Sequence, residues 1–303
     1  MTDAGLSRAG ASGEATTDRA RDAAPVPVLI GGVSELFQGD LDLGRLVVER
    51  LQGEELGSGV FVEELHYGGV AVAQRLEDLR PQVLLLVSSV VRDRPPGTVE
   101  RRRLTPPQLD AVTVQLAVGD AVTGYVHPDL VIEIATAFGV LPQRIVAFEV
   151  EPELVAPGEG LSKTVSVALE DVLDLLRTEA ARCPLLSLAA ELRPLVAGAR
   201  LEGDRLDGDP GDGDTLDALL AGTWNASVPG VSVALQAVRD LLDELVLLDE
   251  HGHWGRTFAL RDRLRLGIAG AHSSEGMDHR DWALWWALVE ELDRLEAREA
   301  LQG

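Results

Sequence analysis

Short, almost continuously apolar runs alternate with helical patterns through the first half of this chain. Apolar runs typical of buried strands lie at 26–30, 82–87 and 143–150, and 60–65 has a partly alternating strand pattern that starts with a β-branched residue. Helical apolar spacing occurs at 41–51, 70–79, 127–138 and 162–182. Because a continuously apolar strand is buried on both faces, this alternation predicts an α/β fold, with a mostly parallel sheet flanked by helices on both faces.

The chain divides into four regions by composition. We expect a disordered leader at 1–24, the α/β domain at 25–182, a linker at 183–214 that ends acidic and glycine-rich, and a mainly helical C-terminal domain at 215–303. Within the last region, the patterns at 229–247 and 278–297 predict helices, and 247–260 is expected to form a hairpin. The chain therefore combines an α/β domain with a second, helical domain.

Charge limits the partners that this chain can take. It has 27 basic and 50 acidic residues, a formal net charge of −23. Such a field repels phosphate backbones and anionic lipid surfaces, so we expect neither a nucleic acid nor a membrane as partner. The leader lacks the apolar stretch of a secretory signal, which predicts a cytoplasmic protein. Cys183 is the only cysteine, which excludes an intramolecular disulfide.

Ligands of parallel sheets bind beyond the carboxyl ends of the strands, so those ends are where chemistry is expected. The first strand leads into a glycine turn and then into Asp40 and Asp42, at the start of a helical pattern. The simplest interpretation is structural: Asp40 caps the helix, Asp42 faces solvent, and His127 packs beside Pro128. No glycine-rich nucleotide loop occurs at this turn.

Several short motifs follow one another in a fixed order along this region. They are Gly32-Val33-Ser34-Glu35, Asp40-Leu41-Asp42-Leu43-Gly44, Gly68-Gly69, the strand 83–90, Pro96-Gly97-Thr98-Val99, 139–142, 148–152 and Gly160-Leu161-Ser162. In this order and register they resemble the hydrogenase maturation endopeptidases over roughly half the chain. The resemblance implies that fold, and a role in processing the C-terminus of a [NiFe] hydrogenase large subunit.

The resemblance also shows where this chain departs from the family. Two carboxylates and one histidine of the family are understood to contact nickel, and their positions fall on Leu41, Ser88 and near Gly124. The asparagine of the family's turn is Glu35. Leucine, serine and glycine side chains do not supply the family's ligands. We therefore expect no metal cofactor; the alternative is a relocated nickel or zinc site formed by Asp40, Asp42 and His127.

Two functions follow from these residues. The first is a noncatalytic relative that binds a hydrogenase large subunit or another client, with Glu35 and Ser88 at the strand ends. In that case Trp282, Trp285 and Trp286 supply a second docking face, unless they form the core of the helical domain. The second is an active metal-dependent endopeptidase with relocated ligands. An unrelated nucleotide-binding enzyme is a third interpretation, which the acidic turn disfavours.

Overall fold

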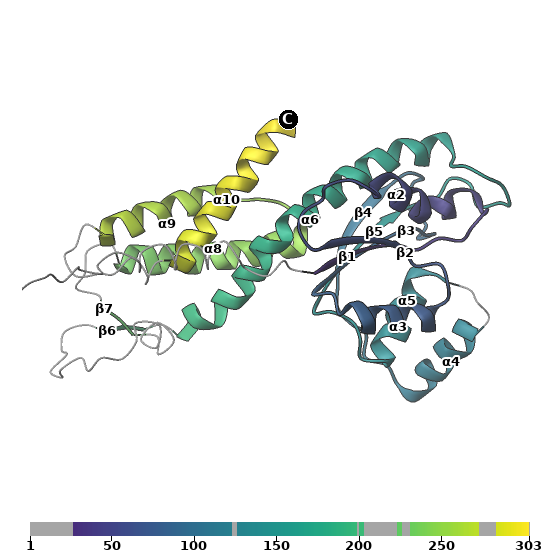
Figure 1. Cartoon of the computed structure of the whole chain (residues 1–303), viewed down its shortest axis with the longest axis horizontal. Helices are drawn as coiled ribbons and strands as arrows, with labels where there is room; N and C mark the ends of the chain where they lie inside the picture. The colour runs from purple at the N-terminus through teal and green to yellow at the C-terminus, as the bar shows by residue number, and fades with distance from the viewer. Residues whose placement is uncertain are drawn as a thin grey trace, which may run out of the picture.

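The structure is a computed structural model, which describes residues 27–122, 126–198, 200–202, 223–225, 231–272 and 283–302. Five strands form one sheet in the order β2-β1-β3-β5-β4 (Figure 1). Their bounds are β1 Val28–Gly32, β2 Val60–Glu64, β3 Val83–Ser89, β4 Val99–Leu104 and β5 Arg144–Val150. The first, second, third and fifth strands are parallel, and β4 is antiparallel to β5. The predicted mostly parallel sheet is confirmed.

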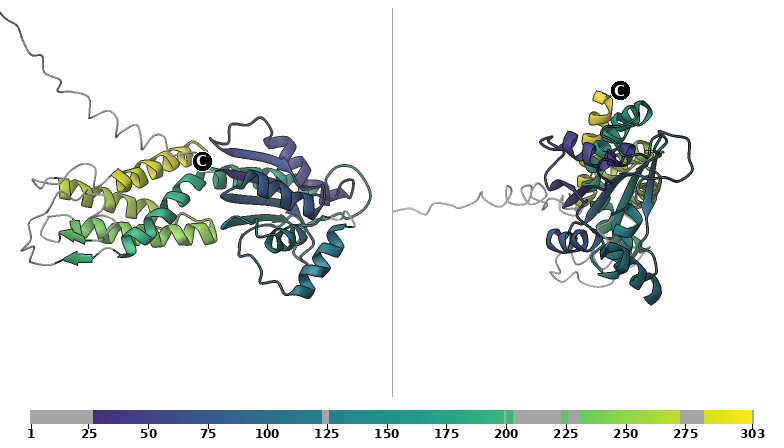
Figure 2. Two further views of the ribbon diagram at one scale, coloured as in Figure 1. Left: turned by 60° about the horizontal axis from the view of Figure 1, so that its bottom comes forward. Right: turned by 90° about the vertical axis from the view of Figure 1, so that its right-hand side faces the viewer.

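Helices cover both faces of this sheet, as predicted (Figures 1 and 2). One face is covered by α2, Leu43–Leu51, after the short 3-10 turn η1, Gly39–Asp42, and by the first part of α6, Lys163–Gly198. The other face is covered by α3, Gly69–Leu79, and α5, Pro128–Ala137, and α4, Ala111–Val122, packs on these two helices. Alternate residues of β3 enter the two cores, which explains why that strand is apolar throughout.

A close approach of two glycines sets the first helix against the sheet. A Cβ atom on Gly32, at the end of β1, would lie 2.3 Å from the carbonyl oxygen of Gly44 in α2. A Cβ atom on Gly44 would in turn lie 2.4 Å from the carbonyl oxygen of Val33. Any side chain at either position would push the helix away from the strand end. These two glycines therefore fix the turn that carries the acidic motif.

The C-terminal domain is a helical bundle that shares α6 with the α/β domain. It contains α6 together with α8, Val231–His251, α9, Thr257–His272, and α10, Ala283–Gln302. Residues 183–198, which we expected to belong to a linker, continue α6 to Gly198. The reason is that Leu185, Leu192 and Val196 enter the bundle core. The glycine-rich 203–214 and the expected leader lie outside the described residues.

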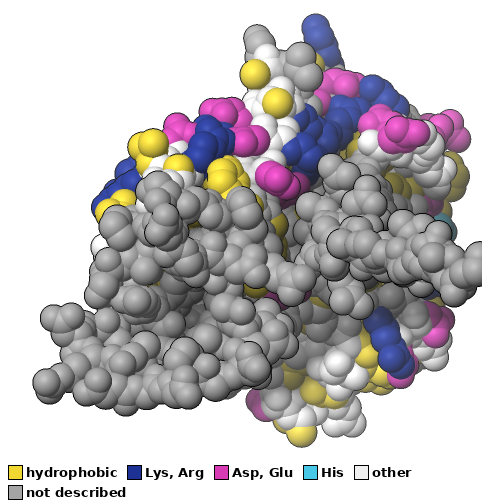
Figure 3. All heavy atoms as spheres, turned by 60° about the vertical axis from the view of Figure 1, so that its left-hand side comes forward, with side chains coloured by type: hydrophobic (Ala, Val, Ile, Leu, Met, Phe, Trp, Pro, Cys, Tyr) yellow, Lys and Arg dark blue, Asp and Glu magenta, His cyan; other side chains and the backbone are white. Residues whose placement is uncertain are grey.

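The expected hairpin at 247–260 is wrong. The helix α8 continues to His251, and α9 begins at Thr257, so that only a short turn separates them. The expected helix at 278–297 is confirmed in part as α10. On the described surface of the bundle, arginine and carboxylate side chains are intermixed (Figure 3). No described helix is both long and apolar enough to cross a membrane.

Candidate functional site

The carboxyl edge of the sheet is formed by the loops that leave β1, β2, β3 and β5. The loop after β1 and the loop after β5 lie against each other. Gly39 N donates to the carbonyl of Gly158 at 3.3 Å, and Asp40 N donates to the carbonyl of Leu154 at 3.0 Å. Gly158 N donates back to the carbonyl of Phe37 at 2.9 Å. Segments more than a hundred residues apart thus form one double loop.

Asp40 joins these two loops from inside. Its side chain is fully buried, and its carboxylate accepts three backbone N–H groups. Oδ2 accepts from Glu153 at 2.8 Å and from Leu154 at 2.7 Å, and Oδ1 accepts from Ser162 at 2.6 Å. We expected Asp40 to cap its own helix, but it makes no such cap bond. Asp40 instead links the loop after β1 to the loop after β5, and both of its carboxylate oxygens accept hydrogen bonds.

Asp42 is also committed to a partner in its own chain. It is 2% exposed, whereas we expected it to face solvent. Arg45, one helical turn later, donates from Nε to both carboxylate oxygens at 3.0 Å and from Nη2 to Oδ2 at 2.6 Å. This is the fork geometry in which arginine binds a carboxylate most firmly. Asp42 therefore anchors the first turn of α2.

His127 serves as the N-cap of α5. Its Nδ1 accepts a hydrogen bond from the backbone N–H of Leu130 at 3.2 Å, and Pro128 occupies the first helical position. The histidine is partly exposed. Gly124, which stands near the family's histidine position, lies outside the described residues.

The two remaining predicted edge residues differ in exposure. Ser88 is 2% exposed within β3, opposite Glu149 of β5. Glu35 is partly buried in the loop after β1, where its N–H donates to the carbonyl of Leu41 at 3.1 Å. Ser88 thus lies inside the sheet, and Glu35 is the more accessible of the two.

Asp40, Asp42 and His127 do not form a metal site in the described part of the chain. No group of three His, Cys, Asp or Glu side chains lies close enough together to hold a metal ion among the described residues. Asp40 and Asp42 already use their oxygens on backbone amides and on Arg45. Nickel or zinc would have to displace those donors before either carboxylate became a ligand. The residues therefore do not fit the metal that the resemblance implies.

An ionic cluster centred on Glu149 lies at the same edge and was not predicted from the sequence. This carboxylate is 2% exposed and accepts hydrogen bonds from Arg92, Arg94 and Arg102 at 3.0, 2.8 and 2.6 Å. Glu151 accepts from the backbone N–H of Arg92 at 2.9 Å. Two glutamates at the end of a predicted strand, Glu149 and Glu151, were the only indication of this cluster in the sequence. Their arginine partners lie on β4 and on the loop before it, and the sequence did not predict that β4 pairs with β5.

Burial alone would raise the pKa of Glu149, but the hydrogen bonds from Arg92, Arg94 and Arg102 outweigh it, so the pKa is lowered. The pKa of Glu179 in α6 is lowered in the same way, mainly by Arg101 and Arg144 against the effect of burial. The folded chain therefore binds fewer protons at these carboxylates than the unfolded chain does. Their contribution to stability is complete above the unfolded glutamate pKa of about 4.3 and is lost as the pH falls through the lower folded values.

We expect the free energy of unfolding, measured in urea, to fall steadily as the pH drops from about 5 to 3, by up to about 1.4 kcal/mol per pH unit for each proton taken up. Glu149→Gln should make that fall less steep, since one of the titrating groups is removed. An unfolding midpoint that stays constant over this range would contradict the lowered pKa values.

The edge also exposes large apolar side chains on each of its four loops. They are Leu36 and Phe37 after β1, Tyr67 after β2, Val91 after β3, and Leu154 and Val155 after β5. Four of them, Leu36, Phe37, Leu154 and Val155, belong to the double loop, and we name these four the edge ridge. Phe37 is 60% exposed and has a φ of 60°, a conformation that is strained for a residue other than glycine. The double loop thus holds a strained phenylalanine in solvent.

The tryptophans expected to form a second docking face lie mostly inside the bundle. Trp285 is 1% exposed and belongs to the bundle core, and Trp286 is partly buried against it. Trp282 lies outside the described residues. The docking interpretation is therefore wrong for Trp285, because the apolar face of α10 packs on α6 and α9.

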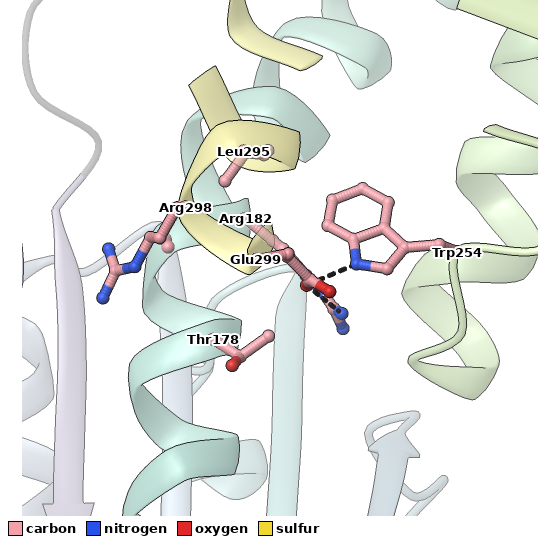
Figure 4. A pocket seen from close by; sticks show the side chains of 7 residues that line it. Thr178, Arg182, Trp254, Leu295, Arg298 and Glu299 are labelled. Carbon is pink, nitrogen blue, oxygen red and sulfur yellow. Dashed lines mark hydrogen bonds and ion pairs between the residues drawn. The ribbon is translucent and has the colours of Figure 1, made fainter. Parts of the chain in front are cut away.

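A small hollow in the bundle involves a further tryptophan (Figure 4). The guanidinium of Arg182 lies 4.5 Å from the ring centroid of Trp254, and the indole N–H of Trp254 donates to Glu299. Arg182 also donates to Glu299 at 3.4 Å and to the carbonyl of Gly252 at 2.9 Å. The polar groups of the hollow thus contact one another, which makes it a junction between α6, α10 and the turn before α9.

No family model and no curated protein matches the chain. Several solved structures are similar to it, and those named here are hydrogenase maturation peptidases. A hydrogenase 2 maturation peptidase from Thaumarchaeota archaeon SCGC_AB-539-E09 is 25% identical, with 50% of this chain and 95% of that chain covered and a TM-score of 0.37. The hydrogenase maturating endopeptidase HybD from Escherichia coli is 21% identical, with 55% and 93% covered and a TM-score of 0.37.

Proposed function

We propose that this chain is a noncatalytic relative of the hydrogenase maturation endopeptidases that binds a client protein at the carboxyl edge of its sheet. The client would be a [NiFe] hydrogenase large subunit or another protein with an exposed apolar segment. One observation carries the proposal: every carboxylate oxygen of the acidic motif, in Asp40 and Asp42, already accepts a hydrogen bond from a backbone N–H or from Arg45 and so holds the edge together.

The chemistry of the edge supports binding over hydrolysis. A metal-dependent peptidase needs at least one open coordination position and ligands free to reach the ion. Here the carboxylate of Asp40 holds two loops together and the carboxylate of Asp42 pairs with Arg45, so both have structural roles. The positions that match the family's ligands carry Leu41, Ser88 and Gly124, none of which can replace them.

The edge ridge supplies the binding surface. Leu36, Phe37, Leu154 and Val155 are each more than a third exposed, and they stand on two loops that Asp40 holds in place. A ridge fixed in advance loses little conformational entropy on binding, which favours affinity. Strained residues such as Phe37 persist where the surrounding structure enforces them, most often at functional sites.

The test is binding of a purified [NiFe] hydrogenase large-subunit precursor to the full chain. The double variant Phe37→Ser/Leu154→Ser should weaken this binding by at least about tenfold, because two exposed apolar anchors are removed. The matched control is Phe61→Ser/Leu247→Ser, since Phe61 and Leu247 are 46% and 47% exposed on β2 and α8. Equal binding by both double variants, or no binding by the unchanged chain, would refute the proposed role of the ridge for this client.

The alternative, an active endopeptidase with relocated ligands, gives an opposite result in the same mixture. We expect the precursor to remain uncleaved when nickel or zinc is added to the purified chain. Cleavage of the precursor's C-terminus that is lost in both Asp42→Ala and His127→Ala would overturn the noncatalytic role. Both variants should be checked for folding by circular dichroism, because Asp42 and His127 also anchor helix ends.

A further inference from the structure

The helix α4 buries two alanines and leaves two large apolar side chains exposed to solvent. Ala117 and Ala121 are 2% and 7% exposed and pack in a small core with Leu130 and Ile134 of α5. Val112 and Leu116, in contrast, are 65% and 64% exposed. A surface helix ordinarily turns its larger apolar side chains to the core, so α4 has the reverse orientation.

The outward residues follow the spacing of a binding face. Val112, Gln115, Leu116 and Gly119 stand at positions i, i+3, i+4 and i+7, which bring them together on one side of a helix. We name these four residues the α4 face. A Cβ atom on Gly119 would meet nothing within 4 Å, so this position leaves space beside the two apolar side chains. The α4 face thus has two apolar side chains beside open space at Gly119, a shape on which another helix can pack.

Charge identifies the partner. The helix α4 contains no lysine or arginine, and Asp110 and Asp120 stand at its two ends. The carboxylate of Asp110 accepts the backbone N–H of Thr113 at 2.7 Å, and that bond lowers the pKa of the carboxyl group. A segment that covers the α4 face and carries basic residues near its two ends would meet both acids.

A second copy of this chain is a poor occupant for the same reason. Two copies would bring Asp110 and Asp120 against identical acids, and each copy has a formal net charge of −23. Four residues also offer far less than the roughly 800 Å² per partner that a stable symmetric interface needs. The face is therefore suited to a single helix from another protein, which would bind through a few apolar side chains.

We propose that the α4 face docks an amphipathic helix of a partner protein, whose apolar side packs on Val112 and Leu116 and whose flanking arginine or lysine residues pair with Asp110 and Asp120. This site does not depend on the edge ridge or on the function proposed for it. Helix-in-groove recognition of this kind is common among proteins that bind short segments of their partners.

The probe is a fluorescent helical peptide of about 18 residues, long enough to form a helix, with leucines at i, i+3, i+4 and i+7 and lysines at both ends. Fluorescence anisotropy with the full chain should give saturable binding. Val112→Ser/Leu116→Ser should raise the Kd about tenfold. The matched control Val167→Ser/Leu266→Ser, at positions 65% and 74% exposed on α6 and α9, should leave the Kd unchanged.

Two further measurements separate docking from general attraction to an acidic protein. Asp110→Asn/Asp120→Asn should weaken binding and make it less sensitive to salt, and a peptide with glutamates in place of the lysines should bind worse. In methyl NMR of the full chain, the peptide should shift the signals of Val112 and Leu116 first. Equal affinity of both serine double variants, or shifts centred on Leu154 and Val155 instead, would overturn the proposal.

The outcome is also independent of the edge ridge. Phe37→Ser/Leu154→Ser, which tests the proposed function, should leave the affinity for this peptide unchanged. If that variant alone reduced the affinity, the peptide would bind at the carboxyl edge, and the α4 face would not be its docking site.

Discussion

Asp40→Ala should lower the free energy of unfolding by about 3–5 kcal/mol, because three backbone N–H groups lose the buried carboxylate that accepts them. These donors belong to Glu153, Leu154 and Ser162. Urea unfolding at pH 7, monitored by circular dichroism, gives this free energy directly. The same variant should also weaken client binding, since the two halves of the edge ridge would separate.

Two substitutions calibrate this result. Asp40→Asn retains the size of the side chain and one acceptor oxygen, so it should lose less stability than Asp40→Ala. Glu49→Ala removes only an exposed pairing with Arg45 and should change stability by less than about 0.5 kcal/mol. A loss below about 1 kcal/mol for Asp40→Ala would mean that the loops do not depend on this carboxylate.

The second large effect is expected at Glu179 in α6. Its carboxylate accepts two hydrogen bonds of 2.9 Å from Arg101, and it also pairs with Arg144. Both arginines are nearly buried, with side chains 9% and 10% exposed. Glu179→Ala would leave two buried positive charges without this partner, so we expect a loss of about 3–5 kcal/mol in the free energy of unfolding.

A surface ion pair between α6 and α2 supplies the control. Glu170 pairs with Arg50, and both side chains are more than half exposed. Glu170→Ala should therefore cost less than about 1 kcal/mol. A double-mutant cycle with Glu179→Leu and Arg101→Met isolates the interaction between those two residues, and a coupling energy near zero would contradict the importance assigned to this pair.

Sequence patterns predicted the parallel strands well, because β1 and β3 contain no charged residue and β5 is apolar except for Arg144 and Glu149. They failed at β4, where residues 100–103 are all charged and resemble a loop. Those residues are tolerated in a strand because Arg101 and Arg103 reach carboxylates of α6 and α8 on one side, while Arg102 reaches Glu149 on the other. Partners that distant in sequence give no local signal.

The candidate site shows the same limit. Asp40 was recognisable as a capping residue, but its true partners lie more than a hundred residues away. The pairing of Asp42 with Arg45 was more accessible to prediction, since residues three apart on a helix are neighbours. The helix α4 was not predicted, and a helix that is apolar on nearly every side gives no indication of which side is buried.

The continuity of α6 has a consequence for how this protein behaves as a whole. Ala180 and Cys183 belong to the core beneath the sheet, whereas Ala181 and Leu185, on neighbouring positions, belong to the core of the bundle. The helix α6 therefore contributes side chains to the cores of both domains. Removing either domain together with α6 would expose the core of the other to solvent. Pro184 lies inside α6 at this junction and cannot donate a helical hydrogen bond, so a movement of the bundle relative to the sheet is expected to bend the helix there.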